Sequence, residues 1–96
     1  MIVAFKSRAL KRYWTKGDAS ALRPDWVARI RLILSRLDVA TAPEQMDLPG
    51  LSFHALKGDL AGRYSILVSR NWRITFGWDA TDLDATDVEL EDYHGH

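Results

Sequence analysis

His54, Lys57 and Arg73 carry side chains suited to work on a phosphate group. A histidine titrates near neutral pH, so it can serve as a general acid or base. Lysine and arginine stabilise the negative charge that develops as a phosphodiester is cleaved. The three residues recur at positions that a sheet could bring together, and a proton shuttle near two cations favours phosphodiester cleavage. Each residue alone also has an ordinary interpretation: a surface arginine, a hydrogen-bonded histidine or a solvated turn lysine.

The last residues add a second group of proton-handling side chains. Asp92 could orient His54 or share a proton with it. Tyr93 could stack on a base or donate a proton, and His94 could do either. Ordinary polar residues at a frayed C-terminus are the alternative. A metal site formed by Asp92, His94 and His96 is a weak interpretation, because i, i+2 spacing at a terminus is not a specific ligand pattern.

Three motifs carry a resemblance to a known family. They are the His-x-Leu-Lys-Gly-Asp turn at 54–59, the Asn-Trp-Arg-Ile-Thr-Phe strand at 71–76 and the Glu-Asp-Tyr-His ending at 91–94. In that order they resemble the HigB toxins, which belong to the RelE/ParE superfamily of bacterial toxin–antitoxin systems. The resemblance covers nearly the whole chain, although the N-terminal half matches only in its general helical pattern.

The resemblance implies an α+β fold of the RelE type and a toxin that cuts messenger RNA on the ribosome. In these toxins the strand arginine is catalytic, the turn lysine acts at the phosphate, and the Asp-Tyr-His ending lies beside the active site. Catalysis is thereby assigned to His54, Lys57, Arg73, Asp92 and Tyr93, and substrate binding to His94. Which residue is the general base and which the acid stays open. The family implies no metal and no other cofactor.

Partners are also implied by the resemblance. They are a helix-turn-helix antitoxin of the HigA type, encoded beside the toxin, and operator DNA that the toxin reaches only through that antitoxin. One alternative is a ParE-like toxin that binds DNA gyrase and cuts nothing, but such chains lack the acid–base set that this sequence retains. The other alternative is a non-enzymatic binding module that uses the sheet face and the basic helices.

Length and composition limit the class of protein. The 96 residues predict a single domain spanning 1–96. The sequence has no cysteine, which excludes disulfides, a thiolate nucleophile and a cysteine-based zinc site. The apolar run at the N-terminus is too short for a signal peptide, and no stretch approaches the roughly 18 apolar residues of a membrane span. These features predict a cytoplasmic protein without a membrane partner.

The net charge is zero, but the charges are unevenly distributed. Residues 1–40 carry nine Lys or Arg against three acids, a balance of +6. Residues 41–78 have a balance of +1, and residues 79–96 have seven acids and no Lys or Arg. A solvated helix face and a solvated acidic hairpin explain this pattern. A basic surface that faces a polyanion is the sharper interpretation, and charge alone supports it only weakly.

The N-terminal half predicts a short strand followed by helices. Ile2, Val3 and Phe5 favour the strand, and an apolar stripe favours a helix over residues 6–16, ended by Gly17. A second helix should begin near Pro24, with its apolar positions at Val27, Ile30, Leu34 and Leu37. Residues 41–50 are typical of a turn region with a short helix after Pro43.

The second half has a period of two, which predicts strands over residues 51–55, 64–69, 72–78 and 87–92. Only Arg70 and Asn71 separate the middle two runs, so these should form a tight antiparallel hairpin. Strands that follow two helices predict an α+β domain with both helices packed on one face of an antiparallel sheet.

Alternation also predicts which face each strand residue occupies. Trp72 and Ile74 should face the helices, so Arg73 should lie on the opposite, open face. His54 has the parity of Ser52, which favours the open face too. Trp72 is then a core residue rather than a platform for a base. By the same rule Asp92, which has the parity of Leu90, should point toward the core side and leave Tyr93 on the open face.

Overall fold

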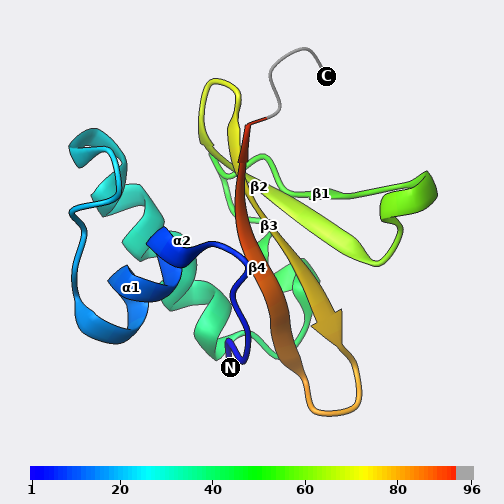
Figure 1. The fold of residues 1–96 in the computed structure, drawn as a ribbon. Coiled ribbons are helices and arrows are strands. Elements are labelled where there is room, and N and C mark those ends of the chain that lie inside the picture. Colours follow the sequence, from blue (N-terminus) through cyan, green and yellow to red (C-terminus); the bar gives the residue numbers. More distant parts are fainter. Residues whose placement is uncertain (93–96) are drawn as a thin grey trace.

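The computed structural model describes residues 1–92. In chain order its elements are α1 (Arg8–Lys16), η1 (Pro24–Trp26), α2 (Val27–Val39), η2 (Pro43–Met46), β1 (His54–Ala55), η3 (Gly58–Leu60), β2 (Arg63–Ser69), β3 (Trp72–Asp79) and β4 (Asp84–Asp92), where η denotes a short 3-10 helix. The strands within these residues form one antiparallel sheet in the order β1-β2-β3-β4. Figure 1 shows both α-helices on one side of this sheet. The predicted α+β arrangement is therefore confirmed.

Helix α1 has a capping residue at each end. The Ser7 side chain accepts a hydrogen bond from the backbone N–H of Leu10 at 3.2 Å, so Ser7 is the N-cap and the helix starts at Arg8 rather than at Lys6. Gly17 has a φ of 70°, and its N–H donates to the carbonyl of Tyr13. This left-handed C-cap confirms the predicted end of the helix.

Helix α2 supplies most of the helical contribution to the core. Pro24 opens a 3-10 turn, and the α-helix proper begins at Val27. The buried positions of α2 include three of the four predicted ones, Ile30, Leu34 and Leu37, together with Ile33. Arg29 ties the helix to the sheet side, because its Nε donates to the Leu67 carbonyl at 2.8 Å.

The hairpin between β2 and β3 forms at Arg70 and Asn71, as predicted. Its register shifts between Leu67 and Ser69, which marks a β-bulge near the turn. On the helix side, Phe53, Tyr64 and Phe76 stack in a row with centroid separations of 5.6 and 5.4 Å. This row continues the core from the sheet toward β1.

The first and last strands differ from the prediction. Only His54–Ala55 of the expected strand 51–55 joins the sheet, because Ser52 has a φ of 48° that interrupts the extended backbone. Strand β4 starts at Asp84 rather than Asp87. Asp87 has a φ of 46° and sits where the register of β3 and β4 shifts, so it forms a bulge inside the strand.

The predicted N-terminal strand is reduced to two parallel bridges, Ile2 to Ala85 and Phe5 to Val88. Figure 1 shows this segment running beside β4 before it enters α1. The backbone N–H of Val3 donates to the Ala85 carbonyl at 3.0 Å, and the Val88 N–H donates to the Ala4 carbonyl at 3.0 Å. The segment therefore extends the sheet at its β4 edge.

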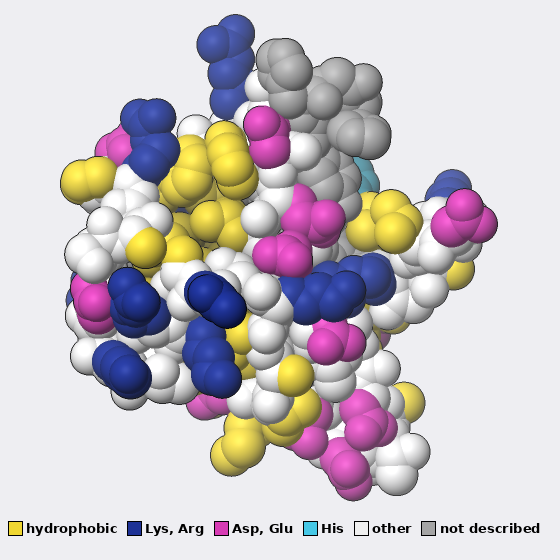
Figure 2. Space-filling model, in the orientation of Figure 1, with side chains coloured by type: hydrophobic (Ala, Val, Ile, Leu, Met, Phe, Trp, Pro, Cys, Tyr) yellow, Lys and Arg dark blue, Asp and Glu magenta, His cyan; other side chains and the backbone are white. Residues whose placement is uncertain are grey.

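The uneven charge of the sequence is also uneven in space. Figure 2 shows Lys and Arg side chains gathered over α1, and Asp and Glu side chains gathered at the tip of the β3–β4 hairpin. Within residues 1–92, no helix is long and apolar enough to cross a membrane.

Candidate functional site

The register of the strands determines which side chains share the face opposite the helices. His54 pairs with Ser65, Ser65 pairs with Thr75, and residues paired across antiparallel strands point to the same side. Arg73 lies two residues before Thr75 in β3, so it points to that side as well. Ile74, between them, is fully buried toward the helices. The predicted placement of His54 and Arg73 on one face of the sheet is confirmed.

Arg73 is held in place by oxygen atoms from two other segments. Its Nη1 lies 3.2 Å from the Ser52 carbonyl oxygen and 3.5 Å from Ser65 Oγ, and it donates to both. The side chain therefore reaches across β2 toward the segment that enters β1. A guanidinium anchored on one side is positioned before a substrate arrives, which is what stabilisation of a developing phosphorane charge requires.

A second arginine organises the neighbouring part of this face. Arg63 Nη2 donates to Thr75 Oγ1 at 3.1 Å and to the Asp87 carbonyl at 2.9 Å. The Thr75 hydroxyl donates in turn to the carboxylate of Glu91, which is the register partner of Arg73 on β4. Thr75 and Ser65 are 0% and 1% exposed. On this face of the sheet, charged side chains therefore cover the buried hydroxyl groups of Ser65 and Thr75.

Arg63, Thr75 and Glu91 are not among the site residues predicted from the sequence. Alternation gives Arg63 and Thr75 the same parity as their neighbours Ser65 and Arg73, so part of the signal is present in the sequence. Their mutual contacts depend on the register between strands, which the pattern of one strand does not contain.

His54 and Lys57 lie at the β1 end of the face. The His54 side chain is exposed in the edge strand β1, where a substrate can reach it. Lys57 is exposed and precedes the 3-10 turn that begins at Gly58, whose φ is 65°. The predicted turn is therefore present. The Lys57 carbonyl accepts a hydrogen bond from the Leu60 N–H at 3.3 Å, whereas its side chain makes no hydrogen bond or ion pair with any residue from 1 to 92.

Asp92 ends β4 and is exposed. It pairs in register with Trp72, as Leu90 pairs with Ile74, so its parity is the one predicted from the sequence. Strands β2 and β3 lie between β4 and β1, and the register does not bring Asp92 beside His54. Tyr93 and His94, two of the predicted site residues, lie outside the described residues.

Two further expectations can be compared with the structure. Trp72 packs against Trp26 with ring centroids 5.2 Å apart and planes inclined at 50°, which confirms its predicted role in the core. In the part of the chain that the structure describes, no group of three or more histidine or acidic side chains is placed to hold a metal ion. The His94 and His96 of the weak metal interpretation are not among those residues.

Two helices on one face of an antiparallel sheet, with anchored arginines on the other face, define a small α+β protein of the RelE-like class. The family model that describes the RelE-like toxin HigB of type II toxin–antitoxin systems matches residues 3–94. A curated relative, the endoribonuclease HigB of Proteus vulgaris, is 39% identical over 94 residues, which cover 98% of this chain and 100% of the relative. The chain belongs to the HigB-like family of type II toxins.

Proposed function

We propose that this chain is an endoribonuclease that cuts messenger RNA held in the ribosome and so inhibits translation and growth. The observation that carries the proposal is the anchored Arg73 on the same sheet face as the exposed His54. A relative that spans the same length is named an endoribonuclease, which supports this activity. The toxin family implies an antitoxin as partner.

In the proposed reaction the RNA supplies its own nucleophile, the 2′-OH. The protein has to place this hydroxyl in line, remove its proton, stabilise the phosphorane and protonate the leaving 5′-oxygen. Arg73 and Lys57 are assigned to charge stabilisation. His54 and Asp92 are assigned to proton transfer. Because the nucleophile comes from the substrate, these steps need no metal-activated water.

Further roles belong to the C-terminal residues. Tyr93 is assigned to positioning or stacking a base, and His94 to contacting the substrate. Strands β2 and β3 separate β4 from β1, so Asp92 and His54 can transfer protons at one phosphate only from different sides of it. Proton transfer at the two oxygens of a phosphodiester requires groups at two positions, which suits that separation.

The proposed partners and setting follow from the family. The antitoxin is proposed to be a helix-turn-helix protein of the HigA type, and operator DNA is proposed to bind only through it. The toxin is proposed to be one domain that works in the cytoplasm, where its message and ribosomes are.

The Arg73→Ala variant tests the proposal. The guanidinium lies on the face away from the core, so the variant should fold, and loss of one preorganised charge stabiliser should slow cleavage about 10²-fold or more. Cleavage of ribosome-bound message is measured with the purified proteins, and growth arrest is measured on expression. Arg36→Ala is the matched control, because Arg36 is an exposed arginine on α2.

Two outcomes would contradict the assignment. A folded Arg73→Ala protein that cuts message at the parental rate would remove the proposed role of this residue. A wild-type protein that arrests growth without cutting any message, and that inhibits purified DNA gyrase, would identify a ParE-like toxin instead.

A further inference from the structure

A hollow of about 410 Å³ lies between the N-terminal segment and the helices, away from the face that carries Arg73. Its lining is largely apolar and includes Ile2, Phe5 and Trp14. Two further lining residues, Met1 and Val3, are 66% and 53% exposed. Exposed large apolar side chains around a hollow are typical of a surface that another molecule covers.

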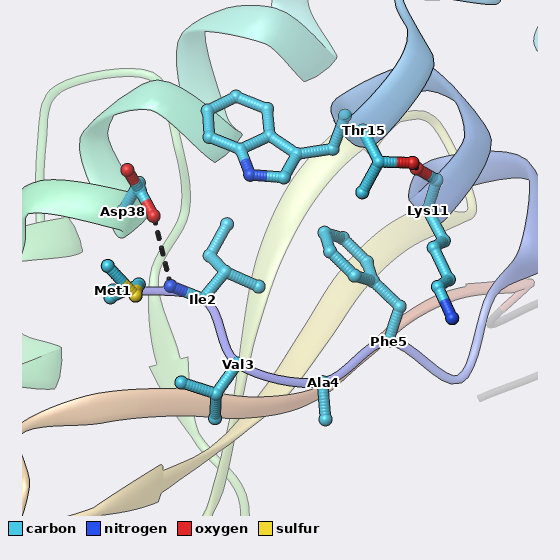
Figure 3. A pocket seen from close by; sticks show the side chains of 9 residues that line it. Met1, Ile2, Val3, Ala4, Phe5, Lys11, Thr15 and Asp38 are labelled. Carbon is cyan, nitrogen blue, oxygen red and sulfur yellow. Dashed lines mark hydrogen bonds between the residues drawn. The ribbon is translucent and has the colours of Figure 1, made fainter.

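The two ends of this hollow carry opposite charges. Figure 3 shows Asp38 and Lys11 on opposite sides of it. Asp38 is engaged inside the protein, because its Oδ1 accepts a hydrogen bond from the backbone N–H of Ile2 at 3.0 Å. Lys11 is exposed and lies on the outer surface of α1.

A second hollow, of about 300 Å³, continues from the first along α1. The two hollows share Lys11 and Thr15. The other residues that line the second one are basic: Arg8, Arg12 and Lys16. Of these, Arg12 lies within ion-pair distance of Asp18, at 3.8 Å. An apolar hollow thus passes directly into a cationic one.

We infer that this continuous surface is the docking site for the antitoxin, and that it takes a segment in which an apolar side chain is followed by acidic residues. The apolar side chain fills the hollow at Trp14, and the acidic residues lie along α1. Asp38 repels acidic residues at the far end, so the segment has a defined direction. The inference rests on the proposed function only in taking an antitoxin as the partner.

The apolar half of the surface is the reason to favour a protein segment over RNA. A nucleic acid backbone would satisfy the cations of α1, but it would leave the hollow lined by Ile2, Phe5 and Trp14 uncovered. A peptide with an apolar anchor and an acidic flank satisfies both halves. Anchors that fill apolar pockets and complementary charges at their rim are common features of protein interfaces.

The test uses the purified full-length toxin and the purified antitoxin encoded beside it. Calorimetric titration is expected to show that Lys11→Glu weakens the affinity by about tenfold or more, because the reversed charge repels the acidic flank. Val3→Ser, which removes apolar surface at the rim, is expected to weaken it by a smaller factor. The matched control is Arg31→Glu, which reverses an exposed charge on the other helix, α2, and should change the affinity less than about twofold.

A second measurement reports on the hollow itself. Trp14 is one of four tryptophans, so 5-fluorotryptophan labelling gives a fluorine spectrum in which Trp14→Phe identifies its resonance. Addition of the antitoxin is expected to shift that resonance. An affinity of Lys11→Glu within twofold of the wild type, or an unmoved Trp14 resonance, would overturn the inference. A Lys11→Glu variant that no longer binds the ribosome but still binds the antitoxin would overturn the inference as well, in favour of RNA as the ligand of this surface.

Cleavage by the wild-type toxin without antitoxin is measured separately, so that failure of the two proposals can be told apart. A toxin that binds its antitoxin at this surface but cuts no message supports the docking site and contradicts the nuclease. A toxin that cuts message and binds its antitoxin elsewhere supports the nuclease and contradicts the docking site.

Discussion

Thr75 connects two charged groups at the centre of the candidate site. Its hydroxyl accepts from Arg63 and donates to Glu91, and it is fully buried. A hydroxyl that both accepts and donates fixes the direction of the chain of hydrogen bonds, so that each bond polarises the next. At the residue scale, the Thr75 hydroxyl thus links side chains from β2, β3 and β4 on this face.

Replacement of Thr75 tests this connection. Thr75→Val keeps the shape but removes the hydroxyl, so Arg63 keeps its bond to the Asp87 carbonyl but loses the Thr75 acceptor, and the Glu91 carboxylate loses the Thr75 donor. We expect the free energy of unfolding to fall by about 1–3 kcal/mol. Urea denaturation measures the change, and Thr75→Ser, which keeps the hydroxyl, should recover most of it. Equal losses for the two variants would mean that the methyl group, rather than the hydroxyl, is what matters.

The faces of individual residues were predictable from the sequence, whereas their contacts were not. Alternation around Trp72 and Ile74 was sufficient to place Arg73 opposite the helices. The hydrogen bond from Arg73 to the Ser52 carbonyl depends on a backbone turn at Ser52, which has a positive φ. A serine in the sequence does not predict such a conformation.

At the scale of the elements, β-bulges determine how the strands present their side chains. The bulge at Asp87 lies where Gly77 faces Thr86 across the pair of strands. A Cβ on Gly77 would lie 2.7 Å from Thr86 Oγ1, which is closer than these atoms can approach. Gly77 therefore allows β3 and β4 to pair closely next to the network formed by Arg63.

Gly77→Ala should consequently lower the free energy of unfolding by about 1–3 kcal/mol, as overpacking does. Thr86→Ala removes the opposing hydroxyl, so the double variant should be more stable than the sum of the two single changes predicts. Urea denaturation of the four proteins gives the coupling. Additive losses would show that the crowding at Thr86 is not what makes the glycine necessary.

Some ends of the helices and strands were predictable from the sequence, and others were not. The end of α1 at Gly17 was predictable, because a glycine offers the left-handed conformation at little cost. The shortness of β1 and the early start of β4 were not, since the first follows from the positive φ of Ser52 and the second from a strand that continues through the bulge at Asp87. The separation of Asp92 from His54 likewise follows from the strand order, which no single motif contains.

At the scale of the whole molecule, a basic group and an acidic group of side chains lie apart from each other. One group of basic side chains lies over α1, and one group of acidic side chains lies at the tip of the β3–β4 hairpin (Figure 2). The net charge is zero. Binding of free RNA depends on the number of phosphates that a protein neutralises, so a chain with this balance has little general attraction for RNA in solution.

We therefore expect slow cleavage of naked message and fast cleavage of message held in the ribosomal decoding site. The ribosome fixes the geometry of the substrate, and a well-oriented substrate reduces the barrier that a small protein would otherwise have to overcome by binding alone. Single-turnover rates on one message, with and without ribosomes and with the same toxin concentration, make the comparison. The Arg73→Ala protein, run in parallel, gives the background from any contaminating nuclease. Equal rates on the two substrates would show that the active site positions RNA without help, and the requirement for the ribosome would then be wrong.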